Sequence, residues 1–493
     1  METTATPRYP EIDTTPSATA LGALRVREAR QITQLAWPTV IAMLSHTFMW
    51  WVDSALLGHY DKIDLAASGL GGGIAWTAYC LFNNLSRING TFVSQAHGRR
   101  DDRAIGDYTW QGLYIAIAAG LLLQAFGYFS FYLLSFTRND PLVLEHAYQY
   151  IRWRTASAVF TQVGFCLMGF YTGRRRVMVP MWAGVVGNVA NVVLDIWLIF
   201  GWSGFTLAGR TWLAVGPMGV EGAAIATSIG TALTAFVQIA LFVGPREHRR
   251  RYLVHRPRRP DWRQLGRIVR VGSPAAWENF VDMSGFTAFT IIVGTTGAAA
   301  LAANTISLHL LSLVFMPMWG LTIAGSVLTG NWIGAGRPDQ AAAYARQVYK
   351  LGIYYMLALG SVYLAFGGRL FRVFSDDPAV LAFGGGLVAV IAIFQLPDGL
   401  RMVSVGILQG AGDTRYPMIA SMVVLWLGFV PLTAWLMIGR QATLVQAWLG
   451  ATACYAVIAL ALYLRFRSDR WQQARIFGRD EAAARHGAGS GEE

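Results

Sequence analysis

Long apolar segments recur along the whole chain, and each is long enough to cross a lipid bilayer as a helix. The expected spans are 32–58, 65–94, 108–134, 146–172, 178–202, 218–244, 264–294, 299–333, 344–371, 380–410, 415–438 and 443–466. Only 14% of the 493 residues are charged, whereas soluble domains carry about 25%. The sequence therefore predicts an all-α polytopic membrane protein with twelve transmembrane helices embedded in a lipid bilayer.

Arginines are concentrated in every second connection between the expected spans. They occur at Arg99, Arg100 and Arg103, at Arg174–Arg176, from Arg246 to Arg270, at Arg337 and at Arg415. Because basic connections stay on the cytoplasmic side, we expect both termini in the cytoplasm, with residues 1–31 and 467–493 as polar tails. The net charge of +12 then reflects orientation and contact with an anionic leaflet, and does not indicate nucleic-acid binding.

The two halves of the chain repeat the same sequence landmarks. Pro38 corresponds to Pro274, Gly98 to Gly336, and GRRRVMVPM ending at Met181 to GAGDTRYPM ending at Met418, all at nearly the same separation. We therefore expect two pseudo-symmetric six-helix lobes, 32–244 and 264–466, joined by a basic cytoplasmic linker, 245–263. Because each half begins on the same side, the repeats run parallel, and rocking the lobes would give alternating access.

Five acidic residues inside the expected spans stand out as candidates for buried acids. They are Asp53, Asp195, Glu278, Asp282 and Asp398. A charged side chain at the centre of a membrane helix costs roughly 2.5 to 3.5 kcal/mol, so these acids are expected to face the protein interior. The sequence shows no obvious basic partner for them inside the membrane. Each acid is therefore expected to hold a proton or a cation.

One stretch places an acid on a polar helical face. In NVANVVLDIWLIFG, Asn191 lies one turn and Asn188 about two turns before Asp195, so the three side chains share a face if the segment is helical. A carboxylate that binds either a proton, a sodium ion or an organic cation, but not two at once, couples their transport. The pattern favours a cation-coupled antiporter.

No enzyme motif accompanies these acids. The chain lacks HExxH, Walker A and G-x-S-x-G sequences, and the three cysteines, Cys80, Cys166 and Cys454, show neither metal nor disulfide spacing. Short outer connections argue against a receptor. We therefore expect no enzymatic activity and no cofactor apart from the coupling ion, H+ or Na+.

The chain resembles the multidrug and toxic compound extrusion (MATE) family from about Ala36 to Phe466. The resemblance rests on VDSALLG from Val52, LAASGLGGGI followed by VSQAHGRRDD, NVANVVLDIWLIFG followed by VEGAAIATSIG, LAANTISLHLL followed by AGSVLTGNWIGAGRPD, and FQLPDGLRMVSVGILQGAGDTRYPM. It implies a V-shaped transporter of two six-helix lobes, which we expect to be a monomer. It also implies export of organic cations across the bacterial plasma membrane against a proton or sodium gradient, hence multidrug efflux and antibiotic resistance.

The resemblance also implies roles for single residues. Asp53, Asn191, Asp195 and Thr227 match a polar cluster of DinF-like members, and Pro38 matches a proline at which the first helix bends. Asp282 and Asp398 match acidic positions of NorM-like members, so the two lobes mix two patterns. Either set offers ligands to sodium, although Phe394 stands where some sodium-coupled members have tyrosine. We expect protons to be the coupling ion.

Several alternatives stay open on the sequence alone. Glu278, Asn188 and His46 are secondary candidates that packing would explain equally well, and Asp53 is also consistent with a solvated acid near the membrane surface. The alternative function is a lipid-linked precursor flippase of the related two-lobed superfamily. Such a flippase should present an arginine-rich cavity, whereas Arg87 and Arg401 are the main basic residues expected inside the membrane.

Overall fold

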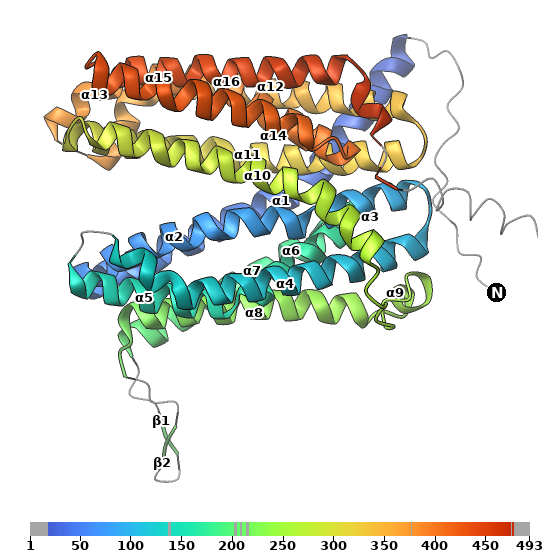
Figure 1. The fold of residues 1–493 in the computed structure, drawn as a ribbon, viewed down its shortest axis with the longest axis horizontal. Helices are drawn as coiled ribbons and strands as arrows, with labels where there is room; N and C mark the ends of the chain where they lie inside the picture. The colour runs from blue at the N-terminus through green and yellow to red at the C-terminus, as the bar shows by residue number, and fades with distance from the viewer. Residues whose placement is uncertain are drawn as a thin grey trace, which may run out of the picture.

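Two helical lobes lie side by side in the computed structural model (Figure 1). The structure describes residues 18–136, 140–201, 205–207, 210–212, 216–375, 377–474 and 476–477. The N-lobe comprises α1 (Ala18–Tyr60), α2 (Lys62–Arg87), α3 (Asn89–Gly98), α4 (Asp102–Ser135), α5 (Pro141–Ala156), α6 (Ala158–Gly173), α7 (Met178–Phe200) and α8 (Gly219–Val243). A short helix, α9 (Arg246–Arg251), begins the connection between the lobes.

The C-lobe begins with α10, after the inter-lobe connection. It comprises α10 (Trp262–Gly294), α11 (Ala298–Gly334), α12 (Pro338–Phe374), α13 (Pro378–Ala411), α14 (Arg415–Met422), the π-helical η1 (Val423–Phe429), α15 (Val430–Ala434), the π-helical η2 (Trp435–Gly439) and α16 (Leu444–Arg467). A 3-10 turn, η3 (Arg470–Gln473), follows.

The described helices confirm the expected twelve spans in two lobes. The second span is built from α2 and α3, which meet at Ile88, and the fourth from α5 and α6, which meet at Ser157. Helices α14 to η2 form one continuous eleventh span. Ten described segments are by themselves long and apolar enough to cross a membrane. The fourth span, divided into α5 and α6, and α10, which carries five charged residues, fall outside that group.

The first helix of each lobe packs into the hydrophobic core of the other lobe. Ile32, Leu35 and Ala36 of α1 belong to the hydrophobic core of the C-lobe. In the same way, Ile268 and Ala275 of α10 belong to the core of the N-lobe. The two helices occupy equivalent places in the repeat, so this crossing follows the internal symmetry of the sequence.

The lobes meet closely at the end of the molecule that carries α3 and α9 (Figure 1). A Cβ atom on Gly98 would overlap the backbone carbonyl of Asn331, and one on Gly334 would overlap that of Gln95. The Gln95 side chain also donates to the carbonyl oxygen of Gly410 at 3.0 Å. Glycine is needed at both crossings because the two backbones approach without room for a side chain.

Two local features differ from the expected outline. Helix α1 begins at Ala18, within the expected tail, and runs through Pro38 without interruption. The connection between α7 and α8 carries a hairpin of β1 (Phe205–Leu207) and β2 (Arg210–Trp212), which the sequence did not predict. The remainder of the tails, residues 1–17 and 478–493, lies outside the described residues. The proposed domain limits stay predictions.

Candidate functional site

The structure gathers four predicted residues into a buried polar cluster in the N-lobe. Asp53 comes from α1, Asn191 and Asp195 from α7, and Thr227 from α8, and Asp195 is 0% exposed. Asn191 Nδ2 donates to Thr227 Oγ1 at 3.4 Å, and Thr227 Oγ1 lies 3.3 Å from Asp53 Oδ2. The one-turn spacing of Asn191 and Asp195 places both on the buried face of α7.

Most oxygens of this cluster have no hydrogen-bond donor. Both carboxylate oxygens of Asp195, Oδ1 of Asp53 and Oδ1 of Asn191 are buried and lack a hydrogen-bond partner among the described residues. The Thr227 hydroxyl has one proton and lies nearer the carbonyl oxygen of Ala223, at 2.8 Å, than Asp53. The cluster is therefore rich in acceptors and short of protons.

Asp53 and Asp195 belong to one cluster, because Asp53 lies 3.3 Å from Thr227, Asn191 donates to Thr227, and Asp195 follows Asn191 by one turn on the same buried face. An ionised carboxylate can only accept a hydrogen bond, so a bond between Asp53 and Asp195 requires a proton on one of them. Two adjacent buried carboxylates cannot both ionise without a large electrostatic cost. The geometry therefore suits a site that holds one proton or one cation.

Arg154, near the end of α5, is an intramembrane arginine close to this cluster that sequence reasoning missed. Its guanidinium lies 5.6 Å from the centre of the Tyr79 ring, and Nη1 is buried without a hydrogen-bond partner among the described residues. The positive charge acts on Asp53 electrostatically. Among the described residues, the ion pairs within 4.0 Å do not include one between Arg154 and Asp53. The sequence signal that could have identified Arg154 was its position inside the expected fourth span.

A second buried cluster lies in the C-lobe around Arg401. The guanidinium binds Glu278 through Nη1 at 3.1 Å, Asp282 through Nη2 at 3.0 Å and Asp398 through Nε at 3.0 Å. Tyr455 of α16 donates its hydroxyl to Asp282 at 2.8 Å. Helices α10, α13 and α16 together position these five side chains.

The expectation that the acids lack a basic partner is wrong for the C-lobe. Arg401 follows Asp398 by one helical turn, and this spacing lets the guanidinium reach its own helix and α10 together. The same arrangement gives Glu278 an ion-pair role. The predicted sodium site at Asp282 and Asp398 would have to displace the guanidinium, because Arg401 lies between those two carboxylates.

Aromatic side chains pack beside the C-lobe cluster. The Phe394 ring is buried against Trp448, with ring centres 5.3 Å apart, and against Tyr455, at 5.0 Å. Position 394 thus contributes apolar packing, while Tyr455 supplies the hydroxyl near Asp282.

The secondary candidates lie apart from the N-lobe cluster. Asn188 Nδ2 donates to Ser45 Oγ at 2.7 Å, so it joins α7 to α1. His46 is exposed on α1. The Arg87 guanidinium binds the side chain of Asn84 at 2.8 Å and lies over the Trp319 ring. None of these residues enters the buried acidic clusters.

Comparison with known proteins agrees with this architecture. The MatE family model matches residues 38–197 and 274–435, one match in each lobe. A probable multidrug resistance protein NorM from Rhizobium meliloti is 30% identical over 450 residues, which cover 88% of this chain and 91% of that protein. The probable multidrug resistance protein NorM from Thermotoga maritima is 26% identical and is 95% covered.

Solved structures share the fold at lower identity. A MATE protein crystallised in complex with MaL6 superposes with a TM-score of 0.80 at 19% identity, covering 91% of this chain and 98% of that one. An outward-facing multidrug resistance MATE transporter gives a TM-score of 0.78 at 21% identity, covering 92% and 98%. Both show the same two-lobed arrangement of helices.

Proposed function

The chain belongs to the MATE family, and on this premise we propose that it is an antiporter that exports organic cations across the plasma membrane in exchange for protons. The observation that carries the proposal is the buried pair of Asp53 and Asp195, which lies among acceptors without donors. Both termini are then cytoplasmic, and the protein works as a monomer without a cofactor beyond the coupling ion.

The coupling follows from competition for one negative site. A proton taken up by the pair of Asp53 and Asp195 lowers the negative charge that would hold a cationic substrate nearby, and a bound cation disfavours that proton. An inward proton gains roughly 2.3 kcal/mol per 100 mV of membrane potential. Proton entry at this site therefore drives release of the cation on the outer side.

Sodium is the second candidate for the coupling ion. Asp53, Asn191 and Asp195 together present four oxygens without hydrogen-bond donors, and oxygen is the ligand type that hard cations prefer. The proton is favoured because two buried carboxyl groups share one cluster, and a proton on either of them lowers the electrostatic cost of burying both.

The charges of the C-lobe cluster support an assignment of the coupling site to the N-lobe. One guanidinium faces three carboxylates, which leaves a formal charge of −2 from three negative and one positive groups. Arg401 already occupies the centre of the cluster as a fixed cation. We assign the primary coupling site to the N-lobe and a secondary role to Glu278, Asp282 and Asp398.

The same observation disfavours the flippase alternative. A flippase for lipid-linked precursors needs exposed guanidinium groups to meet pyrophosphate, whereas Arg401 is buried and bound to three acids. Arg87 is engaged by Asn84. Neither arginine offers a free binding surface to an anionic substrate.

Everted membrane vesicles test the proposal. Export of a fluorescent organic cation should follow an imposed pH gradient without sodium, and Asp195→Asn should reduce it to the vesicle background. Asn188→Ala is the matched control on the same helix, because the Asn188 side chain binds Ser45 and no other described residue, and it should keep most of the activity. Export that follows a sodium gradient and ignores a pH gradient would overturn proton coupling, and full activity of Asp195→Asn would overturn the site.

A further inference from the structure

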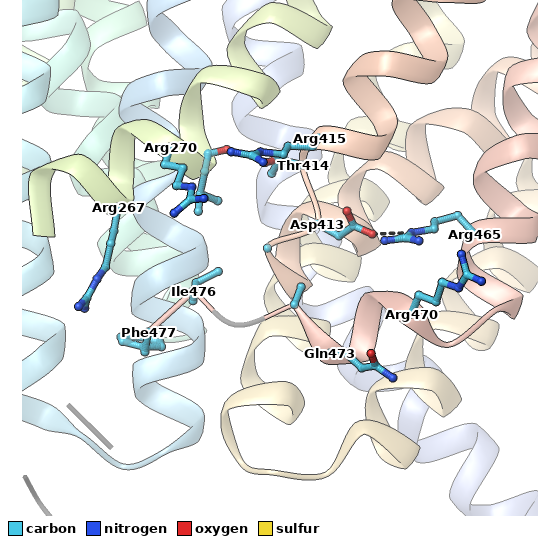
Figure 2. Close-up of a pocket in the computed structure, with 13 residues that line it drawn as sticks. Arg267, Arg270, Asp413, Thr414, Arg415, Arg465, Arg470, Gln473, Ile476 and Phe477 are labelled. Carbon is cyan, nitrogen blue, oxygen red and sulfur yellow. Dashed lines mark hydrogen bonds and ion pairs between the residues drawn. The ribbon is translucent and has the colours of Figure 1, made fainter. Parts of the chain in front are cut away.

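An arginine-lined pocket of about 470 Å3 lies where α10, the turn between α13 and α14, and the segment that follows α16 meet (Figure 2). Its lining includes Arg267 and Arg270 of α10, Arg415 of α14, and Arg465 and Arg470 near the C-terminus. The pocket is remote from both acidic clusters, so the transport chemistry described above gives it no role.

The charge of the pocket is strongly unbalanced. Among the described residues, its lining holds five arginines and a single acid, Asp413. That acid is already bound by Arg465 Nε at 2.8 Å. Arg267 contacts the hydroxyl of Tyr108 at 3.3 Å. The surplus of positive charge therefore comes from Arg270, Arg415 and Arg470.

Three arginines at the pocket have no recorded partner. The structure gives Arg270, Arg415 and Arg470 no side-chain hydrogen bond or ion pair among the described residues, and all three are exposed. Guanidinium groups bind phosphate oxygens through paired N–H donors. Several unengaged guanidinium groups around one pocket are the arrangement that recognises a phosphate group.

The backbone holds the pocket in a fixed shape. Thr414 Oγ1 donates to the carbonyl oxygen of Val271 at 2.7 Å, which ties the α13–α14 turn to α10. Gly412 has a φ of +94°, a left-handed conformation that glycine adopts freely, and a Cβ there would overlap Ile476. The basic side chains therefore project from a built site with an apolar floor that includes Val271, Ile476 and Phe477.

Apolar side chains on the helices that form the pocket are exposed. Trp262 of α10 is 83% exposed, and Val269, Ile419 and Leu464 are exposed on α10, α14 and α16. Ile419 follows Arg415 by one turn, so the helix face that carries this arginine continues as an apolar face. At the end of a membrane span, such a combination suits a headgroup in the pocket and acyl chains alongside it.

We propose that this pocket binds the phosphate headgroup of an anionic phospholipid from the cytoplasmic leaflet. The pocket joins both lobes, because Ile476 and Phe477 of its floor lie in the N-lobe core while Arg415 and Arg465 belong to the C-lobe. The lipid thus binds the arrangement in which the lobes meet at this end and stabilises that arrangement.

The experiment compares lipid binding by the full-length, delipidated protein in detergent. Phosphatidylglycerol or phosphatidylcholine is titrated while bound lipid is counted by native mass spectrometry and thermal stability is followed in parallel. Phosphatidylglycerol should bind and raise the melting temperature. The double variant Arg270→Gln with Arg415→Gln should weaken apparent affinity at least tenfold, which is about 1.4 kcal/mol.

The matched control removes the same charge elsewhere at this end of the molecule. Arg246→Gln with Arg250→Gln changes two exposed arginines of α9 that lie outside the pocket, and it should bind phosphatidylglycerol as the wild type does. Equal binding by the pocket variant and the wild type would overturn the proposal. Equal stabilisation by inorganic phosphate would also overturn it, because the ligand would then be a soluble anion. Neither readout depends on transport or on the coupling ion.

Discussion

Arg401 determines the electrostatics of the C-lobe cluster. Its guanidinium reaches Glu278, Asp282 and Asp398 at 3.0 to 3.1 Å, and all four side chains are buried. A buried ion network stabilises a fold little relative to an apolar core, but removing one partner leaves uncompensated buried charge. Because three acids share one cation, Arg401 is the member whose loss costs most.

Replacing Arg401 with glutamine should therefore destabilise the protein by roughly 3 to 5 kcal/mol. The expected result is a clearly lower melting temperature in detergent, measured by scanning fluorimetry at neutral pH. Adding Asp282→Asn to Arg401→Gln should recover part of the loss, since one unpaired charge disappears. Arg440→Gln, an exposed arginine near Trp435, serves as the control. A melting temperature of Arg401→Gln equal to that of the control would contradict this account.

The sequence allowed some of these residues to be predicted and not others. Asn191 and Asp195 lie one turn apart on one helix, so their shared face follows from spacing alone. Arg401 is equally near Asp398 in sequence, but its other partners belong to α10, and that pairing requires the tertiary fold. Arg154 was hidden because α5 is the least apolar part of its span.

At the level of helices, hydropathy located the spans but not their internal breaks. Ile88 keeps helical dihedral angles, φ −59° and ψ −19°, where α2 gives way to α3, and Ser157 separates α5 from α6 without a proline. Such breaks depend on packing between neighbouring helices, which a single-helix pattern does not encode. The exchange of α1 and α10 between the lobes likewise follows from tertiary contacts.

His248 of helix α9 is held in its neutral form. Its Nδ1 lies 3.1 Å from the carbonyl oxygen of Phe242, and its Nε2 lies 3.2 Å from both terminal nitrogens of Arg174. Since Arg174 can only donate, Nε2 accepts and Nδ1 carries the proton. Burial and the charge of Arg174 lower the pKa of His248 below its ordinary value of 6.5.

This lowered pKa predicts a loss of stability in acid. The unfolded chain binds a proton at His248 below pH 6.5 while the folded chain resists it, so stability falls as the pH drops through that value. The melting temperature should decrease between pH 7.5 and 5.5 more steeply in the wild type than in His248→Gln. His255→Gln, which changes an exposed histidine in the same connection, should keep the wild-type slope. Parallel slopes for all three proteins would exclude His248 as the cause.

For the whole molecule, the contacts between lobes concentrate at one end. Arg175 Nε donates to Asn331 Oδ1 at 3.0 Å, and Thr91 Oγ1 donates to the carbonyl oxygen of Gln409 at 3.1 Å. The internal repeat predicted two lobes, because homologous sequences fold alike. It did not predict which ends touch, since alternating access requires two arrangements of similar energy for the same sequence.

Phe477, which follows α16 and η3, forms a further contact between the lobes. After α16 and η3, which belong to the C-lobe, Phe477 enters the N-lobe core. Its ring lies 5.2 Å from that of Tyr108 and 6.1 Å from that of Phe92, and the Arg99 guanidinium lies 4.0 Å from its centre. These contacts exist only while the lobes are together at this end, so they favour the closed arrangement here.

Phe477→Ala should therefore shift the population toward separation of the lobes at this end. Losing a buried aromatic ring costs about 3 kcal/mol or more, and even half of that changes a two-state population about tenfold. Spin labels at Arg250→Cys and Asp339→Cys, with Cys80, Cys166 and Cys454 changed to serine, report the distance between α9 and α12. The variant should gain a longer-distance population, whereas Gln473→Ala, an exposed change in η3, should keep the wild-type distribution. If Phe477→Ala also keeps the wild-type distance distribution, the Phe477 contacts contribute nothing to closure. The contacts of α3 with α11 and α13 then hold this end by themselves.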